Sequence, residues 1–239
     1  MKLLRVKVSV IMPAYNAAST IDDAVRSVLA QKGALFELLI GDDASKDATW
    51  ERIKRYRPDL RVRAFRFRKN LGAGAASNRL IAKARGRYLS SCDADDRLLP
   101  GNLSRLAEVL DRRPSVGVTY GDVRHDSLGR SLAVRRRMIF PKNWDLLGGF
   151  LANGGTLIRK SLFHKVGGYR ENLPYLEDCD LFLRLAEKTK FFYLPGKPVY
   201  WQTRRPGSLS DQPLGRLRRV SQTILRDAIR RRYGHACRS

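Results

Sequence analysis

The feature that most constrains the fold is a regular alternation of short apolar runs with amphipathic segments over the first 120 residues. Strands are expected at 6–12, 36–40, 61–67, 87–91 and 116–120, since each is a short apolar run bounded by polar or turn residues. Helices are expected between them at 21–29, around Trp50 and Ile53, at 73–84 and at 103–110. This order predicts an α/β fold with a Rossmann-like, mostly parallel central sheet covered by helices on both faces.

The segment 21–29 carries the clearest helical signal. Its apolar stripe consists of Ile21, Ala24, Val25, Val28 and Leu29. These positions recur at the spacing of a half-buried helix. Thr20, with Asp23 three residues on, is interpreted as a capping box at its start.

The alternation ends after Tyr120. Residues 121–155 are rich in Arg and Gly and show little periodicity; short helices are expected at 160–166 and 178–188, and strands at 191–193 and 199–203. We interpret residues 1–212 as one domain, with a regular half at 1–120 and an irregular half at 121–212. Residues 213–239 are interpreted as a basic amphipathic tail, whose helically spaced apolar residues are Leu217, Val220, Ile224, Leu225 and Ile229.

The chain is strongly basic, with 47 Lys and Arg against 23 Asp and Glu among 239 residues. Such a surface attracts anions: nucleic acid, anionic headgroups or phosphorylated small molecules. Three widely spaced cysteines indicate neither a disulfide framework nor a zinc site, and no run approaches the length of a membrane span. We therefore expect a cytoplasmic protein that is, at most, peripheral on the inner face of a membrane.

Acidic residues cluster at three places in this basic chain. The clusters are Asp42 with Asp43, then Asp93, Asp95 and Asp96, then Glu177, Asp178 and Asp180. Asp commonly caps helices and fills turns, and this structural role is favoured for Asp180. The first two clusters, however, follow predicted strands, and ligands bind beyond the carboxyl ends of such strands. Carboxylates two residues apart, as in Asp93-Ala94-Asp95, can bind one divalent cation, Mg²⁺ or Mn²⁺, and leave positions open for two phosphates.

Six motifs together carry a resemblance to a known family. They are Val8 to Asn16, Gly41 to Thr49, Asn70-Leu71-Gly72 with Asn78, Asp93 to Asp96, Gly167-Gly168-Tyr169, and Leu176 to Leu181. In their order and spacing, from Val6 to about Ser210, they resemble the family 2 glycosyltransferases of the GT-A fold. The resemblance implies that 1–120 is the nucleotide-sugar-binding half of the domain and 121–212 the acceptor-binding half.

The resemblance implies inverting transfer of a sugar from a nucleotide-diphosphate sugar, with a UDP-sugar favoured, to the hydroxyl of a glycan or lipid-linked acceptor. It also implies donor-binding residues: Pro13, Ala14, Tyr15, Asn16, Asp42, Asp43, Asn70, Gly72, Asn78, Asp93, Ala94 and Asp95. Within this set, Asp93 would meet the ribose or the metal and Asp95 would be the principal metal ligand. Asp178 would be the general base, beside Glu177 on the acceptor side.

Two departures from the family pattern bear on specificity. Many members have Arg just before the Asn of the third motif, where this chain has Ser77 before Asn78. The Gln-x-x-Arg-Trp box of processive synthases is absent, since the segment 201–206 only loosely echoes it, although Arg204 or Arg205 could contact the diphosphate. We therefore expect a non-processive enzyme that adds one sugar.

Alternatives remain open from the sequence. The net charge would suit a nucleic-acid or membrane-binding protein without catalysis, although no nucleic-acid-binding motif is present and no specific nucleic acid is expected. A catalytically inactive scaffold is a further alternative. The tail 213–239 could bind an anionic membrane surface, pack on the domain or form a homodimer contact.

Overall fold

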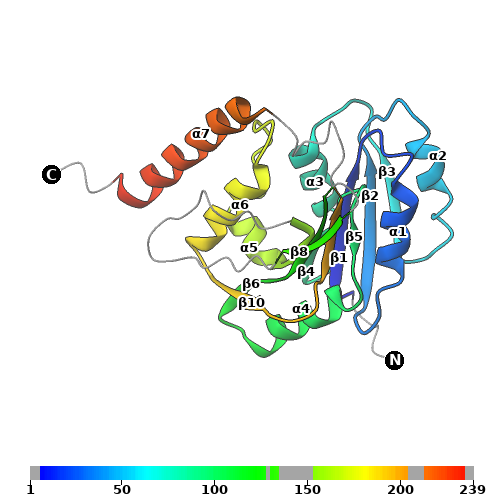
Figure 1. Cartoon of the computed structure of the whole chain (residues 1–239), viewed down its shortest axis with the longest axis horizontal. Coiled ribbons are helices and arrows are strands. Elements are labelled where there is room, and N and C mark those ends of the chain that lie inside the picture. Colours follow the sequence, from blue (N-terminus) through cyan, green and yellow to red (C-terminus); the bar gives the residue numbers. More distant parts are fainter. Residues whose placement is uncertain (1–5, 128–129, 135–152, 204–212, 235–239) are drawn as a thin grey trace.

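The computed structural model describes residues 6–127, 130–134, 153–203 and 213–234. Its centre is a seven-stranded sheet in the order β10-β6-β9-β4-β1-β2-β3 (Figure 1). The strands are β1 (Val8–Ala14), β2 (Phe36–Asp42), β3 (Val62–Arg66), β4 (Tyr88–Ser91), β6 (Val116–Gly121), β9 (Thr156–Arg159) and β10 (Lys190–Leu194). Only β9 runs antiparallel to its neighbours β4 and β6. The prediction of a mostly parallel central sheet is confirmed.

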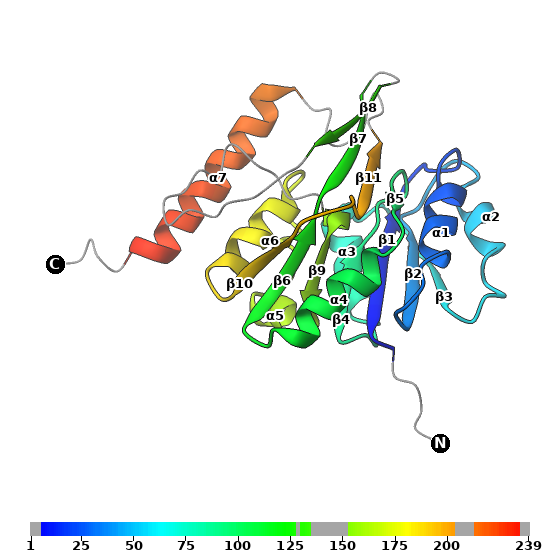
Figure 2. The same cartoon turned by 60° about the horizontal axis from the view of Figure 1, so that its bottom comes forward.

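Helices cover both faces of this sheet (Figure 2). They are α1 (Ile21–Leu29), α2 (Thr49–Lys54), α3 (Ala73–Ile81), α4 (Asn102–Arg112), α5 (Lys160–Lys165) and α6 (Glu177–Ala186). Side chains alternate across each strand, so β1 sends Val10 into one core, with Leu106 of α4, and Ile11 into the other, with Leu181 of α6. The central sheet is therefore buried on both sides, and its polar loops are left at its edges.

The capping box predicted at the start of α1 is wrong. Thr20 is the N-cap residue, but its side chain makes no capping hydrogen bond. Its Oγ1 instead donates to the carbonyl oxygen of Ala17 at 3.3 Å. The helix itself spans the predicted residues, because its buried stripe and not its cap determines where it forms.

A second, smaller sheet has the order β5-β11-β7-β8. Its strands are β5 (Arg97–Leu98), β7 (Val123–Ser127), β8 (Arg130–Val134) and β11 (Tyr200–Thr203). The antiparallel pair β7 and β8 falls in the stretch 121–155, for which no regular structure was predicted. The missed pair is rich in Arg and Ser, so the apolar alternation that marks a strand is weak there.

The last element, α7 (Leu214–Tyr233), packs on α6 and extends from the body of the molecule (Figures 1 and 2). Ile224 and Ala228 are buried there with Leu183 of α6. Of the three roles open for the tail, packing on the domain is the one seen in the structure. Among the described helices, α7 included, none is both long and apolar enough to cross a membrane.

Candidate active site

The loops that follow β1 and β2 are tied to each other by hydrogen bonds from backbone N–H groups to side-chain oxygens. The Asn16 N–H donates to Ser45 Oγ at 2.9 Å, and the Lys46 N–H donates back to Asn16 Oδ1 at 2.9 Å. Asn16 and Ala44 both have positive φ angles, 48° and 61°, which non-glycine residues rarely adopt. The predicted donor loop Pro13 to Asn16 is thus held rigidly against the loop that follows Asp42.

Asp42 lies at the end of β2 and is completely buried. Its Oδ1 accepts a hydrogen bond from the Ser45 N–H at 3.2 Å, while its Oδ2 lies 3.1 Å from Nε of Arg66 in an ion pair. This ion pair lacks the alignment of a hydrogen bond, so Oδ2 retains acceptor capacity. Beside it is an open cavity of about 380 Å³, whose lining consists of Ala44, Ser45, Arg66, Phe67 and Arg68.

Both side-chain oxygens of Asp43 accept hydrogen bonds from within the protein. Its Oδ1 accepts from the Leu71 N–H at 2.8 Å and its Oδ2 from the Gly72 N–H at 2.9 Å. Asn70 Nδ2 donates to the Asp43 carbonyl oxygen at 3.3 Å. Burial raises the pKa of the Asp43 carboxyl, with a further contribution from neighbouring Asp42. Asp43 therefore anchors the loop that precedes α3, although the resemblance assigned it to the donor.

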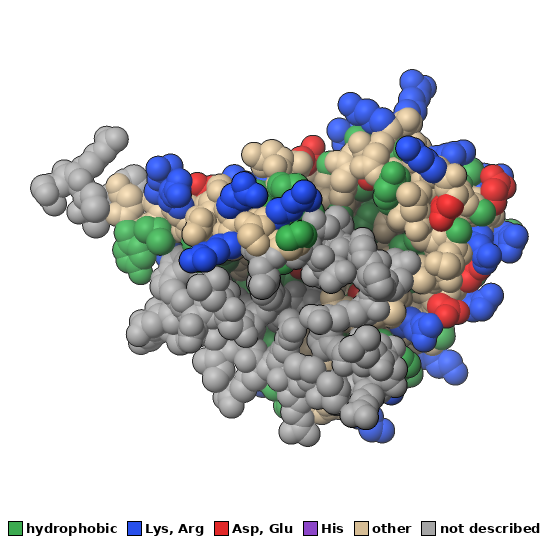
Figure 3. Space-filling model, turned by 45° about the horizontal axis from the view of Figure 1, so that its top comes forward, with side chains coloured by type: hydrophobic (Ala, Val, Ile, Leu, Met, Phe, Trp, Pro, Cys, Tyr) green, Lys and Arg blue, Asp and Glu red, His purple; other side chains and the backbone are tan. Residues whose placement is uncertain are grey.

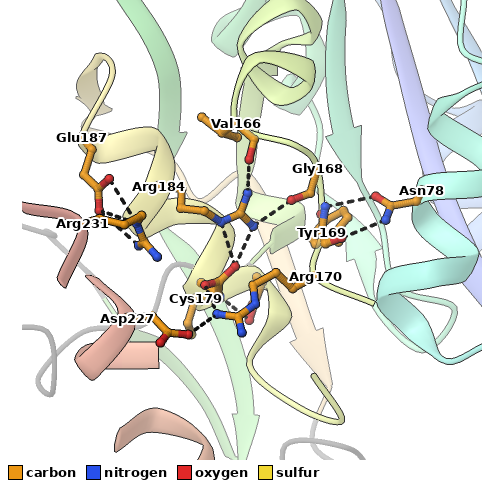
Figure 4. A network of polar contacts seen from close by, with 12 residues as sticks. Asn78, Val166, Gly168, Tyr169, Arg170, Cys179, Arg184, Glu187, Asp227 and Arg231 are labelled. Carbon is orange, nitrogen blue, oxygen red and sulfur yellow. Dashed lines mark hydrogen bonds and ion pairs between the residues drawn. The ribbon is translucent and has the colours of Figure 1, made fainter. Parts of the chain in front are cut away.

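Asn78 also makes structural contacts. Its Nδ2 donates to the Tyr169 carbonyl oxygen at 2.9 Å, and its Oδ1 accepts from the Tyr169 N–H at 3.0 Å (Figure 4). This paired contact joins α3 to the turn at Gly167 and Gly168. Close by, a Cβ added to Gly74 of α3 would lie 3.4 Å from Cγ of Glu177, so the starts of α3 and α6 are adjacent.

The structure brings two of the predicted acidic clusters together, one after β4 and one at the start of α6. The pKa of Asp93 is raised well above its usual range by burial and by the carboxylates of Asp96, Asp95, Asp178 and Glu177, in that order. Burial and Asp178 raise the pKa of Glu177 to about 7. Burial also raises the pKa of Asp178, although its Oδ1 accepts the Cys179 N–H at 2.8 Å. Negative charge is therefore concentrated where the two clusters meet.

Asp96, in contrast, is bound within the fold. Its Oδ2 accepts from the Tyr200 hydroxyl and its Oδ1 from the Thr203 N–H, both at 2.7 Å. The Tyr200 oxygen in turn accepts the Asp93 N–H at 3.3 Å. Tyr200 thus positions the loop that carries Asp93, a role that no sequence signal indicated.

Asp180 confirms its predicted structural role. It is fully buried, and its Oδ2 accepts from Nε and Nη2 of Arg184 at 2.8 and 2.6 Å. Arg170 contacts the other oxygen at 3.4 Å. Arg184 also donates to the carbonyl oxygens of Val166 and Gly168 (Figure 4). The network fixes the first turn of α6, on which Glu177 and Asp178 lie.

The acidic site fits a hard divalent cation whose coordination is completed by a ligand. Among the described residues, no three His, Cys, Asp or Glu side chains surround one point as in a closed metal centre. Mg²⁺ in phosphate-transferring sites is held by one or two carboxylates, with substrate phosphates and water as the other ligands. The oxygen donors of Asp93 and Asp95 match that pattern, and the crowded negative charge around Asp93 is what a cation would neutralise.

Comparison with known proteins agrees with this arrangement. The family model described as glycosyl transferase family 2 matches residues 9–167, and a second, described as glycosyltransferase like family 2, matches residues 123–228. The chain is 41% identical over 104 residues to the succinoglycan biosynthesis protein ExoO of Rhizobium meliloti, covering 44% of this chain and 30% of ExoO. The chain spans 30%, 31% and 64% of the length of three curated relatives that it matches, less than two thirds of each.

Two solved structures show the same fold. S. aureus TarS in complex with UDP matches with a TM-score of 0.73 and 23% identity, over 93% of this chain and 65% of TarS. A mannosyltransferase from Pyrobaculum calidifontis, in complex with GDP-Man and Mn²⁺, matches with a TM-score of 0.72 and 17% identity, over 95% and 65% of the two chains. The fold predicted from the motifs is confirmed, and the chain belongs to glycosyl transferase family 2.

Proposed function

We propose that the chain transfers one sugar from a nucleotide-diphosphate sugar to an acceptor hydroxyl, with inversion at the anomeric carbon. The observation that carries this proposal is the joint acidic site formed by the end of β4 and the start of α6. It adjoins the loops after β1 and β2, so that a donor and an acceptor could meet at one edge of the sheet.

The donor side has parts suited to a nucleotide. The Oδ2 of Asp42 has no hydrogen-bond partner, and a nucleotide base in the neighbouring open cavity would reach it if the Arg66 side chain, which lines that cavity, moved aside. Known structures of this fold contain UDP and UDP-GlcNAc in TarS and GDP-Man in the mannosyltransferase. We favour a UDP-sugar as the donor.

Asp178 is proposed as the general base. The acceptor oxygen forms a bond to the anomeric carbon while the bond from that carbon to the diphosphate oxygen breaks, and Asp178 takes the acceptor proton. The pKa of this carboxyl is raised, which makes it a stronger base than an exposed aspartate. Glu177, adjacent and with a pKa of about 7, lies on the same side of the site.

Asp95, with Asp93, would hold a Mg²⁺ or Mn²⁺ ion on the donor side. Such an ion supplies Lewis-acid stabilisation of the departing diphosphate. The chain's own contribution is to hold the Asp93 loop in place through Tyr200 and Asp96.

The acceptor is proposed to be a growing cell-envelope or exported glycan. The relative ExoO is named for succinoglycan biosynthesis, and the Bacillus subtilis relative TuaG for teichuronic acid biosynthesis. The acceptor would enter from the α6 side, where Glu177 and Asp178 lie.

The test is a panel of UDP-, GDP- and TDP-sugars incubated with the purified chain and Mn²⁺, followed by NMR of the released or transferred sugar. An inverting enzyme gives first the anomer opposite to that of the donor. Retained configuration would overturn the inverting mechanism. Binding of duplex DNA in place of every donor would favour the alternative of a basic nucleic-acid-binding protein.

A further inference from the structure

One face of helix α7, here called the inner face, packs against the rest of the domain. Ile224 and Ala228 on this inner face are buried with Leu183 of α6. Figure 1 shows α7 beside α6. Two ion pairs join the same face to the body: Arg170 with Asp227 at 2.7 Å, and Arg231 with Glu187 at 3.1 Å (Figure 4). Together these contacts set the rotation of α7 about its axis, and with it the direction of the opposite face.

The opposite, outer face of α7 is both cationic and apolar. With about 100° of rotation per residue, two sets of side chains fall on the half of the helix away from Ile224. They are Arg218, Arg219, Arg226 and Arg230, and Leu225, Ile229 and Tyr233. All four arginines are exposed, and Ile229 and Tyr233 expose 52% and 53% of their surface. Figure 3 shows cations and hydrophobic side chains interleaved along this helix.

No acidic residue balances these charges within the outer face, because the one acid in the sequence of α7 is Asp227 on the inner face. The exposed side chains of Ile229 and Tyr233 keep apolar surface in water, which is unfavourable. Neighbouring cations one turn apart, such as Arg226 and Arg230, repel each other. Both costs are relieved by a partner that is anionic and offers an apolar layer beneath its charges.

We propose that the outer face of α7 lies on an anionic lipid bilayer. The arginines would contact headgroup phosphates, while Ile229 and Tyr233 enter the boundary between headgroups and acyl chains, as in interfacial amphipathic helices. A second copy of the chain is a poorer partner, because a two-fold contact through this face would oppose the same cations. A nucleic-acid backbone would match the cations but leave Ile229 without an apolar partner.

The orientation of the domain follows from the inner face. Because α7 is fixed to α6, and α6 begins with Glu177 and Asp178, the acidic site is held at one orientation to the bilayer. The proposal stands apart from the proposed reaction, since membrane binding is measured without turnover.

The test is flotation of the full chain with vesicles of phosphatidylcholine alone, or of phosphatidylcholine mixed with an equal amount of phosphatidylglycerol. The charge variant replaces the outer-face Arg218, Arg219, Arg226 and Arg230 with Gln. The apolar variant carries Ile229→Ser and Tyr233→Ser. A matched control removes four exposed cations elsewhere: Lys32, Arg55, Arg57 and Lys165, each replaced with Gln. Thermal melting of every variant establishes that it is folded.

The wild type and the control should float with the anionic vesicles. The partition coefficient of the charge variant on these vesicles should be lower by at least about 10²-fold. The apolar variant should lose binding by a smaller factor while keeping its salt dependence. Equal loss in the control, or unchanged binding of the charge variant, would overturn the proposal. It would also be overturned if the wild type formed a dimer that did not bind vesicles and that dissociated on Tyr233→Ser. The same holds if the wild type did not bind vesicles but bound duplex DNA, and the apolar variant kept that DNA binding.

Discussion

The donor loops and the acidic site lie at the same edge of the sheet but differ in how their carboxylates are compensated. In the donor loops, both oxygens of Asp43 accept backbone N–H groups, and Asp42 is paired with Arg66. At the acidic site, Asp93, Glu177 and Asp178 face one another, and their pKa values are all raised. The carboxylates of the first region are therefore held mainly by groups of the protein, whereas in the second the carboxylates of Glu177 and Asp178 raise the pKa of Asp93. We propose that a bound cation neutralises this charge.

A third set of acids sharpens this contrast. Asp96 and Asp180 are both buried, yet the fold satisfies them through Tyr200, Arg184 and Arg170. They lie one to three residues from members of the acidic site. The neighbours of Asp93, Glu177 and Asp178 are thus bound within the fold, and they keep the loop after β4 and the first turn of α6 in place.

The largest effect is expected from Asp178→Asn, which removes the proposed base and preserves the shape of the side chain. Turnover should fall by about 10² to 10⁴, the usual contribution of a general base, while donor affinity stays the same. Steady-state kinetics and calorimetric binding of the donor measure the two quantities. Near-normal turnover would remove Asp178 from this role.

Next in size is Asp180→Ala, which breaks the buried ion-pair network beneath α6. Leaving Arg184 without its partner should lower the free energy of unfolding by about 3 to 5 kcal/mol. Chemical denaturation measures this loss. Exposed Asp23, whose ion pairs lie at the surface, is the control, because Asp23→Ala should cost less than about 1 kcal/mol. Equal costs for the two variants would mean that the network is not structural.

Glu177→Gln should act in the opposite direction and stabilise the chain. The folded-state pKa of Glu177 is raised to about 7, so the wild type loses stability as pH rises from about 4.5 to 7 and this buried carboxyl ionises. The variant escapes that loss, and should be more stable by about 1 to 3 kcal/mol above pH 7. The gain should vanish below about pH 4.5. Melting curves across this pH range check the sign, and a gain independent of pH would contradict it.

The smallest effect is expected from Asp43→Asn in the donor loops. An amide can accept only one of the two N–H bonds that Asp43 accepts, so one backbone donor, from Leu71 or Gly72, loses its partner. Because these N–H groups are only partly buried, the free energy of unfolding should fall by about 0.5 to 1.5 kcal/mol, with turnover lowered only through weaker donor binding. A loss of turnover as large as that of Asp178→Asn would place Asp43 in the reaction itself.

Periodicity was a reliable guide to the parallel strands of the central sheet and to the helices between them, because these elements carry alternating or helically spaced apolar residues. It did not predict β9, the antiparallel strand of that sheet. The helix at 21–29 has the predicted bounds even though Thr20 does not cap it. The strands β7 and β8 were missed because their sequences lack an apolar alternation. Local patterns therefore failed for the polar strands of the small sheet and for β9, whose four residues are too few to show a period.

Site residues were predictable as a set but not in their individual contacts. The motifs indicated which loops gather at the sheet edge, and Asp93, Glu177 and Asp178 do meet there. They did not show that Asn78 binds the backbone of Tyr169, 91 residues further along the chain. Contacts between residues so far apart in the sequence depend on how α3 and α6 pack together. The spacing of residues within either helix does not predict that packing.

The central claim is that the acidic site is completed by a divalent cation and a nucleotide diphosphate. Calorimetry of UDP binding with and without Mn²⁺, for the wild type and for Asp95→Ala, tests it most directly. The wild type should bind UDP at least about tenfold more tightly with Mn²⁺, and Asp95→Ala should lose that gain while keeping its metal-free affinity. An identical Mn²⁺ response in both proteins would contradict the claim.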